Sequence, residues 1–128
     1  MRKEYQVKGL PAPLSHYADA VSYNGVLYLS GVIGVDSDNN VVAGGTLSQT
    51  RKIFQNIQLI FDEVGGGIGF KDVLKVTVYM LDVNERSDIN PVRKEFFGLY
   101  KPASTLIGVN KLALPDLRIE IEAIVAMG

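Results

Sequence analysis

Two carboxylates near the end of the chain have a spacing that places them together. Glu120 and Glu122 alternate with apolar residues through residues 117–125, which is the period of a half-buried β-strand. Side chains two positions apart in a strand lie on one face, so both carboxylates point the same way. Carboxylates are among the side chains that exchange protons with substrates. The alternative for Glu120 is an ordinary strand residue, solvated or paired with Arg118 or Lys75.

Few other side chains in the sequence are suited to acid–base catalysis or metal binding. His16 is the only histidine, and its unperturbed pKa lies near neutrality, although a surface or capping role is the alternative. With no cysteine and one imidazole, neither a thiolate nor a multi-histidine metal site is expected. Asn90 directly precedes Pro91 and fits a helix cap. The run Gly65–Gly67 lacks the Lys-Ser/Thr ending of a phosphate loop and indicates the end of a helix.

The composition narrows the class of protein. Thirteen basic and fourteen acidic residues give a net charge of −1 with no charge block, so nucleic-acid binding has no electrostatic support. No apolar run approaches the roughly 18 residues of a membrane helix. We expect one domain over residues 1–128, a cytoplasmic location, and neither a nucleic-acid nor a membrane partner.

Hydrophobic periodicity and turn signals predict the elements that position these residues. The expected order is a hairpin over 18–31 turning at Asn24-Gly25, a helix over 46–64, a strand over 73–81, a helix from about 88–91 to Pro102, and strands over 104–109 and 117–125. This order predicts an α+β fold in which two helices pack on one face of a mixed sheet.

The same periodicity predicts which side chains are buried. The predicted buried faces are Leu47, Thr50, Ile53, Ile57, Ile60, Phe61 and Val64 in the first helix, Val92, Phe96, Leu99 and Tyr100 in the second, and one strand face of Leu74, Val76, Val78 and Met80. Thr46 and Gln49 resemble a capping box at the start of the first helix.

The uncovered face of the sheet mixes polar and apolar side chains. It is expected to carry Lys75, Thr77, Tyr79, Glu120 and Glu122 together with Val73, Leu81 and Ile124. A subunit interface containing polar sites explains this mixture. A solvated face with scattered apolar residues is the alternative that periodicity leaves open.

Several segments in order along the chain resemble the Rid/YjgF family. They are Leu14-Ser15-His16-Tyr17, Leu29-Ser30-Gly31, Gln49-Thr50-Arg51, Asn56-Ile57, residues 73–79, Ile89-Asn90, Phe96-Phe97, Lys101-Pro102-Ala103-Ser104-Thr105 and Ile119-Glu120-Ile121-Glu122-Ala123. The resemblance runs from about Pro11 to Ala126, and the order and spacing of the segments carry it rather than any one motif.

This resemblance implies a chorismate-mutase-like fold and a homotrimer with three intersubunit clefts. Best-known members hydrolyse enamines and imines released by pyridoxal-phosphate enzymes, giving a 2-oxo acid and ammonia. They use no metal or cofactor of their own.

The family's site residues carry over by position. Glu120 matches the carboxylate that positions the attacking water, and Tyr17 matches the tyrosine that lines the pocket with it. The resemblance places the substrate-binding positions at His16, Ser30, Gly31, Asn90, Ser104, Thr105 and the Leu106 amide. Glu122 is expected to make a structural hydrogen bond.

One position departs from the family pattern. Well-studied members carry an arginine directly after the Pro-Ala pair, where it grips the substrate carboxylate, but this chain has Ser104. A hydroxyl brings no charge, so 2-iminopropanoate and 2-iminobutanoate are expected to be poor substrates unless Arg93 or Lys111 supplies the cation. Some relatives act on ring-cleavage amines such as aminomuconate.

Three functions remain in competition at this point. The first is deamination of a reactive enamine or imine, which Glu120, Tyr17 and Ser30-Gly31 favour. The second is a non-catalytic small-molecule-binding or chaperone-like trimer, which Ser104 favours. The third is an endoribonuclease, against which the balanced charge and the single histidine argue.

Overall fold

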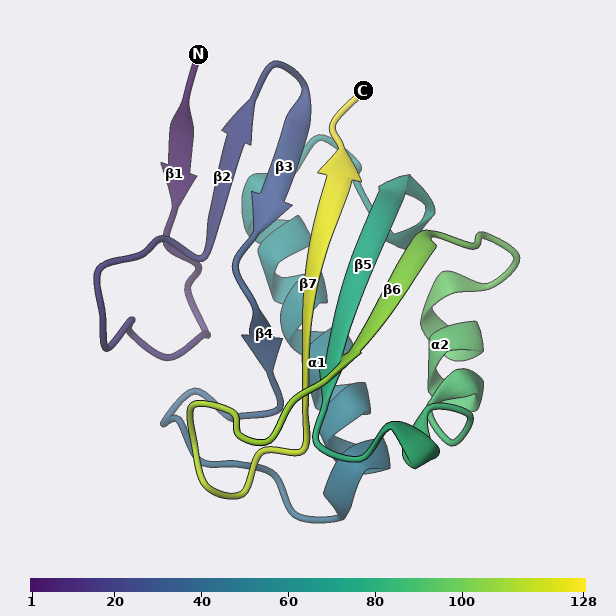
Figure 1. The fold of residues 1–128 in the computed structure, drawn as a ribbon. Helices are drawn as coiled ribbons and strands as arrows, with labels where there is room; N and C mark the ends of the chain where they lie inside the picture. The colour runs from purple at the N-terminus through teal and green to yellow at the C-terminus, as the bar shows by residue number, and fades with distance from the viewer.

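The computed structural model describes all 128 residues, and its strands form one mixed sheet in the order β1-β2-β3-β7-β5-β6, with β4 also paired to β7 (Figure 1). The strands are β1 (Lys3–Tyr5), β2 (Ala20–Tyr23), β3 (Val26–Leu29), β4 (Val32–Ile33), β5 (Val73–Met80), β6 (Ala103–Gly108) and β7 (Ile119–Ala126). The helices are α1 (Gly45–Val64) and α2 (Asn90–Phe97), with short 3-10 turns η1 (Phe70–Asp72) and η2 (Val83–Glu85). Both α-helices lie behind the sheet in Figure 1, which confirms the predicted fold class. Neither has the length and apolarity needed to cross a membrane.

Strand β7 lies in the middle of the sheet, antiparallel to β3, β4 and β5. Its buried residues are Ile119, Ile121, Ala123 and Val125, preceded by the buried Leu117. The alternate residues Glu120 and Glu122 are half-buried on the opposite face, as the sequence predicts. The open face of the sheet therefore carries both carboxylates.

Helix α1 packs its apolar stripe against the sheet and an aromatic cluster. Ile53, Ile57 and Ile60 are fully buried, and the Phe54 ring packs against Phe70 and Phe97 with centroids 5.8 and 5.5 Å apart. Such edge-on aromatic pairs add about 0.5–1.5 kcal/mol beyond the area they bury. The predicted burial of Leu47 is wrong: its side chain is exposed, because the first turn of α1 directs Thr46 inward instead.

The predicted capping box at the start of α1 is also wrong. Gly44 occupies the cap position, and no side chain caps the helix. Thr46 instead donates its hydroxyl to Glu85 Oε1 at 2.8 Å, and the Gln49 amide donates to the Asp116 carbonyl at 3.0 Å. Both side chains therefore bind partners that are distant in sequence. These hydrogen bonds connect α1 to η2 and to the segment that precedes β7.

A β-bulge at the start of β5 reverses two of the predicted orientations. Val73 pairs with Val125, but Lys75 pairs with Ile124, so Leu74 is an extra residue in the ladder. Val73 is buried, and Leu74 is 52% exposed. Side chains alternate between the two faces of a strand. One extra residue therefore reverses which residues before the bulge face the core and which face outward.

The buried side of α2 is shorter than predicted. Val92 and Phe97 are buried, but the helix ends at Phe97, and the chain reverses at Gly98, which has a φ of 61°. Leu99 is therefore 96% exposed and Tyr100 is exposed as well, so their predicted burial is wrong. This reversal leaves a hollow beside α2.

Candidate functional site

The Glu120 carboxylate lies against the backbone where β3 gives way to β4. Glu120 pairs with Ile33 of β4 on one side and with Tyr79 of β5 on the other. A Cβ added to Gly31 would overlap the carboxylate and would lie 2.8 Å from Glu120 Cδ. A side chain at position 31 would therefore force the Glu120 carboxylate to move from this place. The resemblance assigns Gly31 to substrate binding, whereas in this chain its missing side chain makes room for the Glu120 carboxylate.

Burial changes the proton affinity of Glu120. The side chain is half-buried, and neither suggested ion pair forms, since Arg118 binds Glu85 and Lys75 donates to Thr105. Burial raises the pKa of Glu120, and the negative charge of Glu122 raises it further. Without a cation nearby, the ionised carboxylate gains little stabilisation, so it accepts a proton more readily than an exposed glutamate.

The neighbouring Glu122 has a different role. The Tyr79 hydroxyl donates to Glu122 Oε1 at 3.0 Å, which is the structural hydrogen bond expected of Glu122. This hydrogen bond, followed by burial and by the charges of Glu122 and Glu120, raises the pKa of Tyr79. Tyr79 therefore stays protonated and fixes one carboxylate beside the other.

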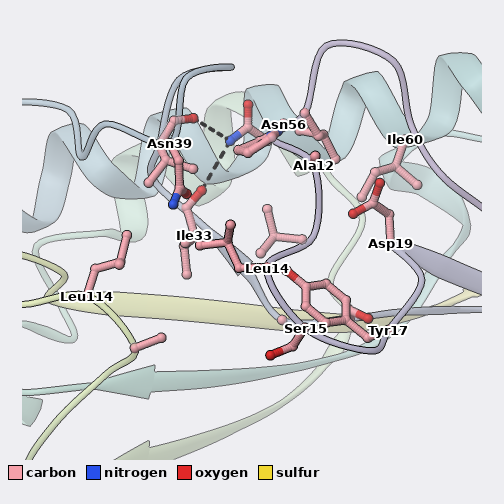
Figure 2. Close-up of a pocket in the computed structure, with 17 residues that line it drawn as sticks. Ala12, Leu14, Ser15, Tyr17, Asp19, Ile33, Asn39, Asn56, Ile60 and Leu114 are labelled. Atoms are coloured by element: carbon pink, nitrogen blue, oxygen red, sulfur yellow. Dashed lines mark hydrogen bonds between the residues drawn. The ribbon is translucent and has the colours of Figure 1, made fainter.

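A cavity of about 210 Å³ opens next to Gly31, between the loop that precedes β2 and helix α1. Tyr17, Ser30 and Gly31, which the resemblance assigns to the site, line it, and Figure 2 places Tyr17 beside Ser15 and Leu14 on one wall. The remaining lining is mainly apolar: Leu10, Pro11, Ala12, Leu14, Val32, Ile33, Val35, Ile60, Ala113 and Leu114, with Ser15, Asp19, Asn39 and Asn56 as the other polar members.

Hydrogen bonds fix the walls of this cavity. The Ser30 hydroxyl donates to the Ala18 carbonyl at 2.6 Å, which ties the end of β3 to the residue after Tyr17. Buried Asn56 on α1 donates to the carbonyls of Ile33 and Val35 at 3.1 and 3.0 Å (dashed lines in Figure 2). Sequence reasoning did not assign Asn56 to the site. Its position on the buried side of an amphipathic helix was the available signal.

Most of the other predicted site residues lie elsewhere. Ser104, Thr105 and Leu106 are on β6, which is exposed along its whole length at the edge of the sheet. Thr105 accepts a hydrogen bond from Lys75 Nζ at 3.0 Å on the open face. Ser104 pairs in register with Val76, a buried residue, and so faces the helix side. Asn90 begins α2.

The backbone of β6 presents free donors at its outer edge. Val109 donates its N–H to the Met80 carbonyl at 2.9 Å, and alternate residues of a strand direct their N–H groups to the same side. The Leu106 amide therefore points away from β5, where no further strand follows. An unpaired edge amide of this kind is available to a ligand or to another chain.

The structure thus divides the predicted site into two groups. Gly31 links the first group, because it contacts Glu120 and also lines the cavity with Ser30 and Tyr17. We call these four residues the carboxylate corner, although Glu120 itself does not line the cavity. The β6 residues lie two strands away from β7, a separation of roughly 10 Å at ordinary strand spacing, and Asn90 is on a helix behind the sheet. His16 is exposed and does not line the cavity.

A mixed sheet with two helices on one face and a half-buried carboxylate on the other defines a class of small α+β proteins. The model of the family described as Endoribonuclease L-PSP matches residues 8–127. The chain therefore belongs to this family, which is the Rid/YjgF family.

Similar proteins agree with this assignment. A RutC family protein of Pyrococcus horikoshii is 35% identical over 97% of both chains. The 3-aminoacrylate deaminase RutC of Acinetobacter baylyi is 33% identical over 91% of both. The 2-iminobutanoate/2-iminopropanoate deaminase of Rattus norvegicus is 34% identical, covering 100% of this chain and 92% of its own. The crystal structure of yeast Mmf1 superposes with a TM-score of 0.90 at 27% identity and full coverage of both chains.

Proposed function

We propose that this protein hydrolyses a reactive imine or enamine to a carbonyl compound and ammonia, with Glu120 orienting and deprotonating the attacking water. The observation that carries the proposal is the Glu120 carboxylate itself, half-buried against Gly31 with no cationic partner. The names of the Acinetobacter and rat relatives, both imine or enamine deaminases, support it.

The proposed hydrolysis requires few catalytic groups from the protein. An enamine first becomes an imine by protonation at carbon, and the protonated imine carbon is electrophilic. Water adds to this carbon as Glu120 takes one of its protons, which gives a carbinolamine. Glu120 returns this proton to nitrogen. The C–N bond then breaks as the hydroxyl oxygen forms the C=O bond and gives its proton back to Glu120, and ammonia leaves. A carboxylate whose pKa is raised by burial suits both the acceptance and the return of this proton.

We further propose that the site is completed between copies of the chain in a homotrimer. In one chain the carboxylate corner and the β6 edge lie in separate places, although family resemblance assigns residues from both to one pocket. The open face also exposes Tyr23 and Tyr28 beside the polar groups, and such patches favour association. Light scattering at micromolar concentration should give about 42 kDa, three times the 14.0 kDa chain. A mass of 14 kDa would contradict the assembly.

The direct test is turnover of freshly generated imines. 2-Iminobutanoate and 3-aminoacrylate would be produced in the cuvette, and formation of the carbonyl product measured with and without the protein. 2-Aminomuconate, a ring-cleavage amine, is the third substrate to test. We expect acceleration of at least one of these hydrolyses and its loss in Glu120→Gln. A wild-type protein that accelerates none of them while binding their products would instead support the non-catalytic binding trimer.

A further inference from the structure

A second hollow, of about 550 Å³, opens along α2 and shares no lining residue with the cavity at the carboxylate corner. Four α2 residues spaced as one helical stripe form one wall: Asn90, Arg93, Lys94 and Phe97. The chain that returns after Gly98 forms the other wall through Leu99, Tyr100, Lys101 and Pro102. This volume suits a small organic molecule.

The charge of this hollow is one-sided. Arg93, Lys94 and Lys101 line it, and no carboxylate does. The acidic residue of α2, Glu95, is engaged elsewhere, because it pairs with Arg51 of α1 at 2.9 Å. The chain as a whole carries a net charge of only −1, so the hollow is a local concentration of positive charge.

Arg93 is the cation in this hollow that burial affects. Its side chain is half-buried and belongs to none of the four ion pairs, which are Arg2–Glu4, Arg51–Glu95, Lys71–Asp72 and Arg118–Glu85. The loss of hydration lowers the pKa of its guanidinium, which still stays charged at neutral pH. A desolvated charge without a partner is costly, and an anion would remove that cost.

The geometry favours a carboxylate over other anions. A planar guanidinium pairs with a carboxylate through two parallel hydrogen bonds, and the nearby Asn90 amide offers further donors. Phe97 and Tyr100 provide apolar surface for the rest of an organic acid. We propose that the α2 hollow binds the carboxylate of a small organic acid, with the Arg93 guanidinium as its charged contact.

The substrate of the proposed reaction supplies such a group, and this part of the inference rests on the proposed function. Ser104 brings no charge to the position after Pro-Ala. Lys111, the other cation considered, is exposed on the loop after β6 and lines neither cavity. Arg93 is then the residue that makes a 2-imino acid a good substrate of this chain.

The fold adds a geometric requirement. Arg93 lies on α2 behind the sheet, whereas Glu120 faces the opposite side. One small substrate can therefore contact both only if Glu120 comes from one copy of the chain and Arg93 from another.

Binding is tested first with 2-oxobutanoate, a stable acid of the same shape as the imine. Amide shifts of residues 90–102 should move in an NMR titration, and Arg93→Met should weaken binding by about tenfold or more. The Met variant keeps the aliphatic stem that packs in the hollow, and Arg93→Lys should recover part of the affinity. Arg51→Gln, which removes an exposed cation, should bind as wild type. Unchanged binding in Arg93→Met, or tighter binding of inorganic phosphate than of 2-oxobutanoate, would overturn the carboxylate site.

Turnover then separates this inference from the proposed function. Arg93→Met should raise KM for 2-iminobutanoate more than it lowers kcat. A wild type that binds 2-oxobutanoate through Arg93 but hydrolyses no imine would defeat the proposed function alone. Active hydrolysis with normal KM in Arg93→Met would defeat the inference alone.

Mixed assemblies test the two-copy arrangement. When Glu120→Gln and Arg93→Met chains are co-expressed, roughly a quarter of the sites in a trimer should contain both wild-type side chains. Activity should therefore reappear in the mixture, well above the mean of the two pure variants. No recovery, with both pure variants folded and impaired, would place the two residues in one chain's site and overturn this arrangement.

Discussion

The carboxylate corner and the α2 hollow differ in how far a single chain satisfies their polar groups. Around the corner, Ser30 donates to Ala18, Asn56 in the cavity wall donates to two carbonyls, and Tyr79 holds the neighbouring Glu122. Glu120 itself has no cationic partner. In the hollow, the Arg93 guanidinium has no ionic partner in the chain. The walls of the first region are therefore fixed before any ligand arrives, whereas the charged group that lines the second is left unpaired. A reaction centre benefits from the former, whereas a specificity pocket tolerates the latter because the ligand completes it.

Removing the proton acceptor from the corner should have the largest effect. Glu120→Gln keeps the shape and the contact with Gly31 but cannot accept a proton, so turnover should fall by about 10²- to 10⁴-fold. The melting temperature should change little, because a buried charge is lost along with its desolvation penalty. Steady-state kinetics and thermal unfolding measure the two quantities. Full activity in this variant would remove Glu120 from the mechanism.

Disturbing the position of the carboxylate should cost less. Gly31→Ala introduces a Cβ into the space that Glu120 occupies, so the carboxylate must move, and turnover should fall by about 10²-fold. Gly69→Ala is the matched control, since its backbone is extended and a Cβ there meets nothing within 4 Å. Equal activities in the two variants would mean that the close contact at Gly31 has no role in catalysis.

The Tyr79–Glu122 pair should tune pH dependence rather than rate. The charge of Glu122 helps to raise the pKa of Glu120, so Glu122→Gln should lower that pKa. Ionised Glu120 would then persist to lower pH, and the acid limb of the kcat/KM profile should move toward acid. Tyr79→Phe removes the hydrogen bond, at about 1 kcal/mol of stability, but keeps the charge. Its acid limb should stay nearer that of wild type, and a reversed order would contradict this assignment.

The smallest effect is expected on the outer side of α2. Arg51 and Glu95 form an ion pair at 2.9 Å, but both side chains are largely exposed. Arg51→Gln should therefore change the free energy of unfolding by less than about 1 kcal/mol in a urea titration. A larger loss would mean that the α1–α2 contact depends on this pair and not on the phenylalanine cluster.

Parts of this molecule could be predicted from sequence because one physical requirement dominates them. The alternation of apolar and polar residues in β7 predicts a strand, because one face is buried and the other carries Glu120 and Glu122. The Asn24-Gly25 turn is readable because both residues need positive φ, and they have values of 51° and 77°. The apolar stripe of α1 could be predicted because one side of the helix is buried. The orientation of its first turn could not be predicted in this way.

Other parts depended on partners that sequence does not identify. Strands β1 and β4, of three and two residues, are too short to have a period. Val73 and Leu74 are both apolar, so either could face inward until the bulge decides between them. The division of the site into two groups follows from strand order, which periodicity does not contain. Arg93 was visible as a cation, but its burial and lack of a partner were not.

The central position of β7 has a consequence for how the chain is made. Strands β3 and β5 are not neighbours, and β7 lies between them although it is the last strand in sequence. During synthesis the earlier strands must wait, with unpaired edges, until the final strand leaves the ribosome and joins them. Such late, long-range pairing is slow and exposes the nascent chain to aggregation. We therefore expect premature termination before residue 119 to yield two incomplete half-sheets rather than a smaller working protein.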